Sequence, residues 1–150
     1  MLHRTEGIVI KTFPFGEADL IVTYLTSGYG MVKTFAKSPR KTKSRFGSSL
    51  EPLTHAKISF WGKEDAALPR LTQADIINSF EKIRASLKCF FKVSEMLELT
   101  LTFVPERDAC SRVYGLLLET LKAVEEDCGS GLRMLQYKLC LLYTSPSPRD

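Results

Sequence analysis

Several features typical of membrane, secreted or zinc-binding proteins are missing from this sequence of 150 residues. No stretch approaches the ~18 consecutive apolar residues of a membrane-spanning helix, which excludes such a span. No long apolar run follows the charged first residues, so we expect no secretory signal. The cysteines form no CxxC pair and only two histidines accompany them, so we expect no zinc site. Spaced cysteines without a leader predict reduced cytoplasmic thiols at Cys89, Cys110, Cys128 and Cys140.

Catalytic signatures are also scarce. His3 and His55 lack the neighbouring serine, cysteine or aspartate pattern that would indicate a catalytic triad. Gly28 and Gly30 lie in a predicted turn and open no helix, so they do not form a phosphate-binding loop. These absences predict a binding protein with no catalytic residues, and not an enzyme.

Positive charge is present, and it is concentrated in one segment. The net charge of +4 arises in the first 80 residues, which hold 11 lysines and arginines against 7 acidic residues. Residues 33–45 contain six basic residues and no acid: Lys33, Lys37, Arg40, Lys41, Lys43 and Arg45. Such unopposed charge favours a polyanion such as nucleic acid. The alternative is a solvated loop that binds nothing.

The first half of the chain has the pattern of a β domain. Short runs rich in β-branched and aromatic residues, separated by turn residues, predict five strands. They fall at about 7–13, 19–26, 31–37, 54–61 and 71–77. Ser27-Gly28-Tyr29-Gly30 predicts a hairpin between the second and third strands. Five short strands at this spacing predict a small closed barrel.

The second half has helical periodicity. Asn78 and Glu81 resemble a capping box at the start of a helix that Pro105 ends. Asp108 is a candidate cap for a second helix ending near Cys128, and a third helix begins near Ser130. The fold class is therefore α+β. It has a five-stranded barrel domain over residues 1–79 and a partial, truncated helical bundle over 80–139.

The last eleven residues, 140–150, break the helical pattern of the third helix. Their sequence, CLLYTSPSPRD, resembles the translation of a transposase adapter used in sequencing libraries. We therefore interpret them as a non-native tail that contributes nothing to the fold. The alternative is a true helix end followed by a Ser/Pro-rich linker.

Strand alternation places candidate binding residues on two strand faces. Lys33, Phe35 and Lys37 share one face of the third strand, and Lys57 and Trp61 share one face of the fourth. Lysines bind phosphates and aromatic rings stack on bases, so this combination is typical of single-strand binding. The alternative is that Phe35 and Trp61 belong to the core and the lysines extend along it to solvent.

Four segments together resemble one protein family. They are GIVIK at residues 7–11, GEADLIV at 16–22, AKSPRKTKSRF at 36–46 and LEPL at 50–53. In order and spacing they are similar to the bacterial recombination mediator family RecO, and the similarity continues to about residue 139.

This resemblance implies an OB-fold barrel joined to a helical domain, and a role in DNA repair and recombination after DNA damage. It implies binding of single- and double-stranded DNA, annealing of complementary strands, and loading of the RecA recombinase together with RecR and the single-stranded-DNA-binding protein SSB. Many family members carry a cysteine zinc site farther along the chain, so we expect no cofactor within these residues. We expect a cytoplasmic, nucleoid-associated protein without membrane contact. The alternative function is an RNA-binding or protein-docking OB module.

Overall fold

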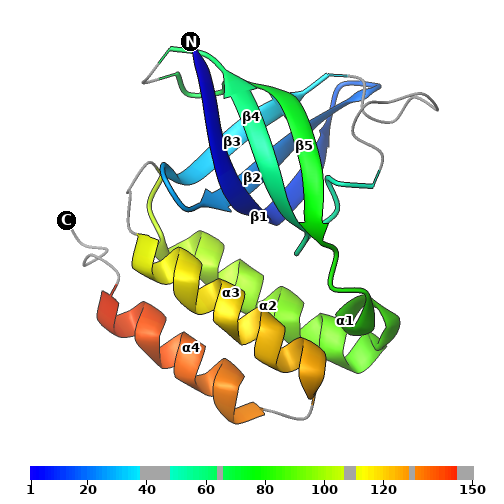
Figure 1. Ribbon diagram of the computed structural model, residues 1–150, viewed down its shortest axis with the longest axis vertical. Coiled ribbons are helices and arrows are strands. Elements are labelled where there is room, and N and C mark those ends of the chain that lie inside the picture. The colour runs from blue at the N-terminus through cyan, green and yellow to red at the C-terminus, as the bar shows by residue number, and fades with distance from the viewer. Residues whose placement is uncertain (38–47, 64–65, 107–110, 129–130, 145–150) are drawn as a thin grey trace.

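The five predicted strands are present and form a closed barrel (Figure 1). The computed structural model describes residues 1–37, 48–63, 66–106, 111–128 and 131–144. The strands, in chain order, are β1 (Leu2–Phe15), β2 (Asp19–Thr26), β3 (Gly30–Ala36), β4 (His55–Trp61) and β5 (Arg70–Asn78). They close in the order β1-β2-β3-β5-β4, which is the strand order of an OB-fold.

β1 is longer than the sequence predicts, because it serves two neighbours. Its first half pairs with β4 from Leu2 to Ile8, and its second half pairs with β2 from Gly7 to Phe15. A bulge between Val9 and Lys11 lets the strand bend from one partner to the other. The predicted end of the strand at Phe13 is therefore wrong, and Phe15 still belongs to the sheet.

The interior of the barrel is filled by one face of every strand. Val32 and Ala36 from β3 and Ala56, Ile58 and Phe60 from β4 are all at most 2% exposed. They belong to a single apolar cluster with residues of the other three strands. The faces of β3 and β4 opposite the candidate binding residues therefore point into the barrel.

Four helices follow the barrel within the described residues, where the sequence predicts three. They are α1 (Glu81–Ala85), α2 (Leu87–Phe103), α3 (Ser111–Glu126) and α4 (Gly131–Thr144). The continuous helix predicted from Asn78 is interrupted at Ser86, whose backbone is extended and whose hydroxyl accepts a hydrogen bond from the Cys89 N–H. Ser86 therefore caps α2.

α1 begins without a side-chain cap, because its first flanking residue, Phe80, has no hydrogen-bonding atom in its side chain; the backbone of Phe80 is left-handed, with φ 54°. Asn78, the predicted cap, instead accepts a hydrogen bond from the Phe80 N–H. The predicted cap Asp108 lies outside the described residues.

The helices lie against one end of the barrel and share a core with it (Figure 1). Ile8, Leu25 and Met31 from the strands pack in the same apolar cluster as residues of α2, α3 and α4. No helix within the described ranges is long and apolar enough to span a membrane.

α4 continues past the point where the sequence pattern breaks. It ends at Thr144, and Leu141 is 2% exposed within the helical core. The predicted helix end at Leu139 is therefore wrong, and at least part of the segment 140–150 packs against the fold.

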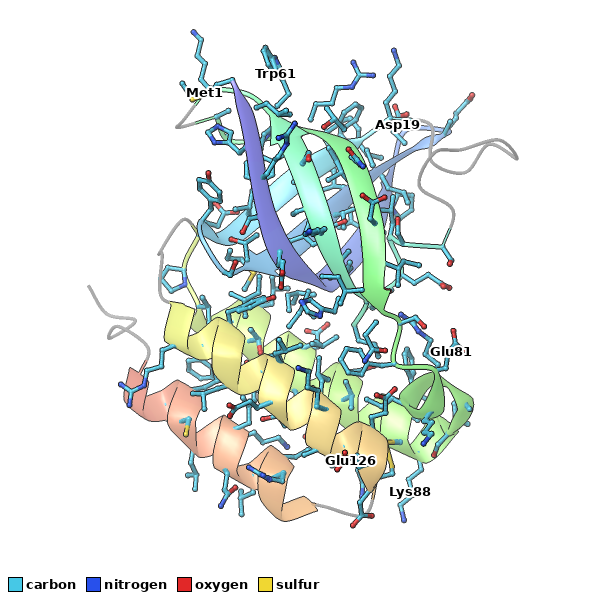
Figure 2. All side chains as sticks on the ribbon, in the orientation of Figure 1. Met1, Asp19, Trp61, Glu81, Lys88 and Glu126 are labelled. Carbon is cyan, nitrogen blue, oxygen red and sulfur yellow. A yellow bond between two sulfur atoms is a disulfide. The ribbon has the colours of Figure 1, made fainter. Side chains whose placement is uncertain are left out.

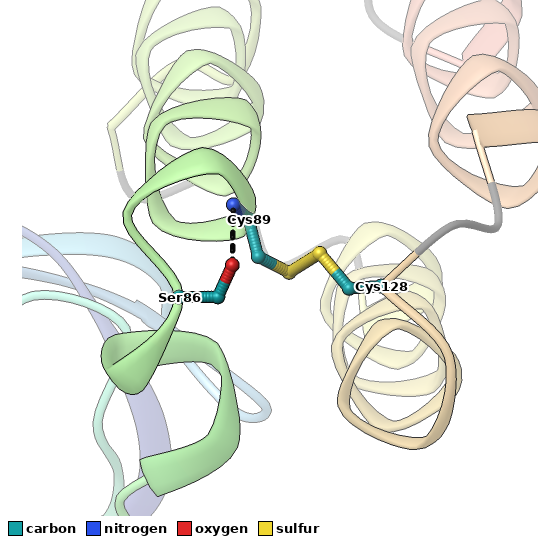
Figure 3. The surroundings of a disulfide bond; sticks show 3 residues. All are labelled: Ser86, Cys89 and Cys128. Carbon is teal, nitrogen blue, oxygen red and sulfur yellow. Dashed lines mark hydrogen bonds between the residues drawn. A yellow bond between two sulfur atoms is a disulfide. The ribbon is translucent and has the colours of Figure 1, made fainter.

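Two cysteines predicted to be reduced are joined in a disulfide. Cys89, at the start of α2, bonds to Cys128, just after α3, with a Cα–Cα distance of 5.8 Å (Figure 3). Cys89 is fully buried, and its predicted thiol state is wrong. Cys140 lies half-buried on α4, and Cys110 lies outside the described residues.

A polar network joins the barrel to α3. The buried His55 Nε2 of β4 lies 2.8 Å from the Tyr114 hydroxyl and 3.3 Å from Glu6 Oε1. The Tyr114 hydroxyl also donates to Glu6 Oε1 at 3.4 Å. Burial lowers the pKa of His55 and raises the pKa of Tyr114, and the Glu6 carboxylate opposes the first effect and adds to the second. The network thus favours a neutral imidazole at the junction.

Candidate nucleic-acid interface

The predicted outward face of β3 is present on the barrel surface. Lys33 is exposed and Phe35 is half-buried, while Thr34 between them is fully buried inside. Lys37, directly after β3, is exposed as well. Met31 shares this face but is buried, because it packs in the apolar cluster that the strands share with the helices. The interpretation of Phe35 as a core residue is therefore wrong.

Two phenylalanines of β1 extend this aromatic surface. Phe15, half of whose surface is exposed, meets Phe35 edge to face with ring centroids 5.8 Å apart. Phe13 is also exposed, and the ammonium of Lys11 lies 5.9 Å from its ring centroid. Sequence reasoning missed Phe15 because it ended the strand at Phe13, and it did not consider the outward face of the first strand, which carries Phe13. The signal was there, since Lys11, Phe13 and Phe15 alternate along β1. We call Lys11, Phe13, Phe15, Lys33 and Phe35 the groove face.

A groove opens between this face and the end of α2. It encloses about 410 Å³ and brings two lysines to one side and apolar helix residues to the other. Its lining residues are Lys11, Phe13, Thr23, Met31, Lys33, Leu101, Val104 and Glu106. The groove therefore places two ammonium groups beside an aromatic ring, which are the kinds of group that contact phosphates and bases in single-strand-binding proteins.

The second predicted aromatic, Trp61, lies farther around the barrel. It is 56% exposed, so the interpretation of Trp61 as core is wrong. Register places Phe35 opposite Arg70, and Arg70 opposite Trp61. Residues directly opposite one another on neighbouring strands point to the same side of the sheet. An exposed arginine therefore links the two aromatic residues, and sequence reasoning missed it because it stands alone at the start of β5.

The path from Phe35 to Trp61 curves, because the barrel is closed. Neighbouring strands lie about 4.8 Å apart, so the two residues are separated by about 10 Å along the sheet surface and point in different directions. Figure 2 shows Trp61 at the end of the barrel that faces away from the helices. A bound strand would have to bend around the barrel to contact both.

Lys57 occupies a different environment from the other predicted lysines. It is exposed on β4, but register places it between Glu6 on β1 and Asp75 on β5. These carboxylates balance its charge, and they line a mixed-charge hollow of about 380 Å³ with Arg4. Lys57 therefore shares a strand face with Trp61, as predicted, but not an unopposed positive surface.

The remaining predicted contacts, Arg40, Lys41, Lys43 and Arg45, lie outside the described residues. Within the part of the chain that the structure describes, no group of three or more His, Cys, Asp or Glu side chains could hold a metal ion.

A family model described as "Recombination protein O N terminal" matches residues 1–80, which span the whole barrel. The chain belongs to the RecO family. The matched segment contains the groove face, Arg70 and Trp61, whereas Glu106 lies beyond it.

Relatives of the RecO family extend the similarity into the helices. The chain is 51% identical to a DNA repair protein RecO of Thermodesulfovibrio yellowstonii over 126 residues, covering 84% of this chain and 50% of that protein. It is 37% identical to a DNA repair protein RecO of Dehalococcoides mccartyi over 140 residues, covering 93% of this chain and 52% of that protein. A Koribacter versatilis relative of the same name is 34% identical over 121 residues, covering 81% and 50%. The chain thus spans about half the length of these relatives.

Proposed function

We propose that this chain is the DNA-binding part of a recombination mediator that acts in DNA repair. The observation that carries the proposal is the groove face, where three phenylalanines and two lysines lie on the outer surface of an OB barrel. The outer face of strands β2 and β3 is where OB-folds bind oligonucleotides. Membership of a family whose relatives are named for DNA repair supports the same role.

In this proposal, a single strand lies along the groove face and passes Arg70 to reach Trp61. Lysine ammonium groups neutralise phosphates, and the rings stack on bases of any sequence. The basic segment between β3 and β4 adds further phosphate contacts. The protein carries out no chemical step, so no catalytic residue or cofactor is required.

We also propose the roles that the family resemblance implies. The chain binds duplex DNA and anneals complementary strands. It works in the cytoplasm, at the nucleoid, with RecR and SSB to load the RecA recombinase. These activities are proposed for a protein of the relatives' full length. This chain spans about half of that length.

Binding of labelled oligothymidylate, followed by fluorescence anisotropy, tests the proposal. Lys33→Gln should weaken binding and reduce the slope of log K against log salt by about 0.7, the value for one phosphate contact on a single strand. Lys88→Gln is a matched control, because Lys88 is exposed on α2 far from the groove (Figure 2). Equal loss in both variants, or in neither, would contradict the proposed site.

Competition with RNA of the same length separates DNA binding from the alternative RNA-binding function. A mediator of DNA repair should bind the DNA strand at least as tightly. Much tighter RNA binding would indicate recognition of the 2′-hydroxyl and would overturn the DNA assignment.

A further inference from the structure

The groove beside the groove face is also lined by a carboxylate, Glu106, which opposes the positive charge of the lysines. Glu106 Oε1 lies 3.4 Å from Lys33 Nζ, and both side chains are about half exposed. Both residues line the groove beside Phe13 and Lys11. A phosphate that approaches Lys33 therefore meets the negatively charged Glu106 carboxylate, which already pairs with the Lys33 ammonium.

The backbone holds Glu106 at this place. Glu106 follows α2 and forms a parallel β-bridge with Met31, which precedes Lys33 by two residues on β3. Met31 is 1% exposed, so the bridge is anchored on a buried residue. The carboxylate is thus carried by a segment attached to the strand that presents Lys33, and not by a freely placed surface chain.

We propose that Glu106 is an affinity-setting residue that competes with nucleic-acid phosphate for Lys33. This inference rests on the proposed function, because it assumes that Lys33 binds phosphate. An exposed ion pair contributes little to stability, so a phosphate displaces the carboxylate at small cost. The displaced carboxylate stays near the groove and repels the phosphate that replaced it. Glu106 therefore keeps the affinity for a single strand lower than Lys11 and Lys33 alone would give. A lower affinity suits a protein that must release its strand.

The test is the charge-neutral, nearly isosteric variant Glu106→Gln, measured with oligothymidylate. Because it removes one negative charge from the groove, affinity should rise about three- to tenfold at low salt. The slope of log K against log salt should steepen by up to about 0.7. Glu126→Gln is the matched control, since it makes the same charge change at the far end of α3 (Figure 2). The control should bind as the parent does, and an equal gain in both variants would overturn the proposal.

The variant Lys33→Gln separates this inference from the proposed function. If Lys33→Gln weakens binding while Glu106→Gln leaves it unchanged, the site stands and the competition is refuted. If Lys33→Gln has no effect, the proposed site itself fails. In the double variant Lys33→Gln, Glu106→Gln, the gain from Glu106→Gln should largely disappear. A gain of the same size in the absence of Lys33 would show general repulsion and overturn the competition. Thermal melting of each variant, expected to match the parent within a few degrees, excludes unfolding as the cause.

Discussion

Replacement of Phe35 by alanine distinguishes a binding surface from a core. Phe35 is half-buried on the outside of β3, and its edge-to-face contact with Phe15 is its only aromatic contact among the described residues. Such a pair contributes about 0.5–1.5 kcal/mol, so with its partial burial we expect a loss of about 1–2 kcal/mol of stability. For a chain of this size that is about 2–8 °C in Tm. Loss of base stacking should weaken single-strand binding by about 1–3 kcal/mol, or about 5- to 150-fold.

Phe60→Ala provides the reference for a true core residue. Phe60 is 1% exposed inside the barrel, and its removal should cost about 3–5 kcal/mol of stability. Both variants are measured by thermal melting and by anisotropy with one oligonucleotide. If Phe35→Ala lost as much stability as Phe60→Ala, the assignment of Phe35 to the surface would be refuted. If it melted as expected but bound like the parent, Phe35 would be excluded from the binding site.

Three further predictions follow from the junction, the last helix and the basic segment. Because burial lowers the pKa of His55 in the folded state, the unfolded state binds more protons below about pH 6.5, so stability should fall as pH drops through that value. His55→Gln should flatten this dependence in melts between pH 5 and 8. Ending the chain after Leu139 removes the buried Leu141 and should lower Tm by several degrees, whereas an unchanged Tm would restore the interpretation of 140–150 as non-structural. A triple alanine variant of the basic segment should reduce the salt slope for single strands by about 2 and weaken unrelated sequences alike, and an unchanged slope would exclude the segment from binding. Its three positions are Arg40, Lys41 and Lys43.

The strands could be predicted because their signal is local. Alternation in β3 and β4 showed which residues share a face, and the structure buries the faces that carry Val32 and Ile58. The first half of β1 could not be found in this way, because its pairing with β4 joins segments more than 40 residues apart. The break at Ser86 was missed for a related reason. The apolar spacing continues through α1 and α2, and only the side-chain cap shows where one helix ends.

The disulfide and the balance of charge depend on distances that spacing does not give. Cys89 and Cys128 are 39 residues apart in sequence, and helix packing alone brings them together. Lys57 and Lys33 each share a strand face with an aromatic residue, so the sequence pattern does not distinguish them. The cross-strand neighbours of Lys57, however, are the two carboxylates Glu6 and Asp75. Glu106 follows the strands by many residues, and only the fold brings it to Lys33.

The central claim is that a single strand runs from the groove face around the barrel to Trp61. Trp61 is the only tryptophan in the chain, so its intrinsic fluorescence reports on one position. Titration with unlabelled oligothymidylate should quench this fluorescence, because a base stacks on the indole. The quenching should saturate over the same concentration range as the anisotropy change, and Arg70→Gln should weaken both. Full binding by anisotropy with no change in Trp61 fluorescence would contradict the proposed path.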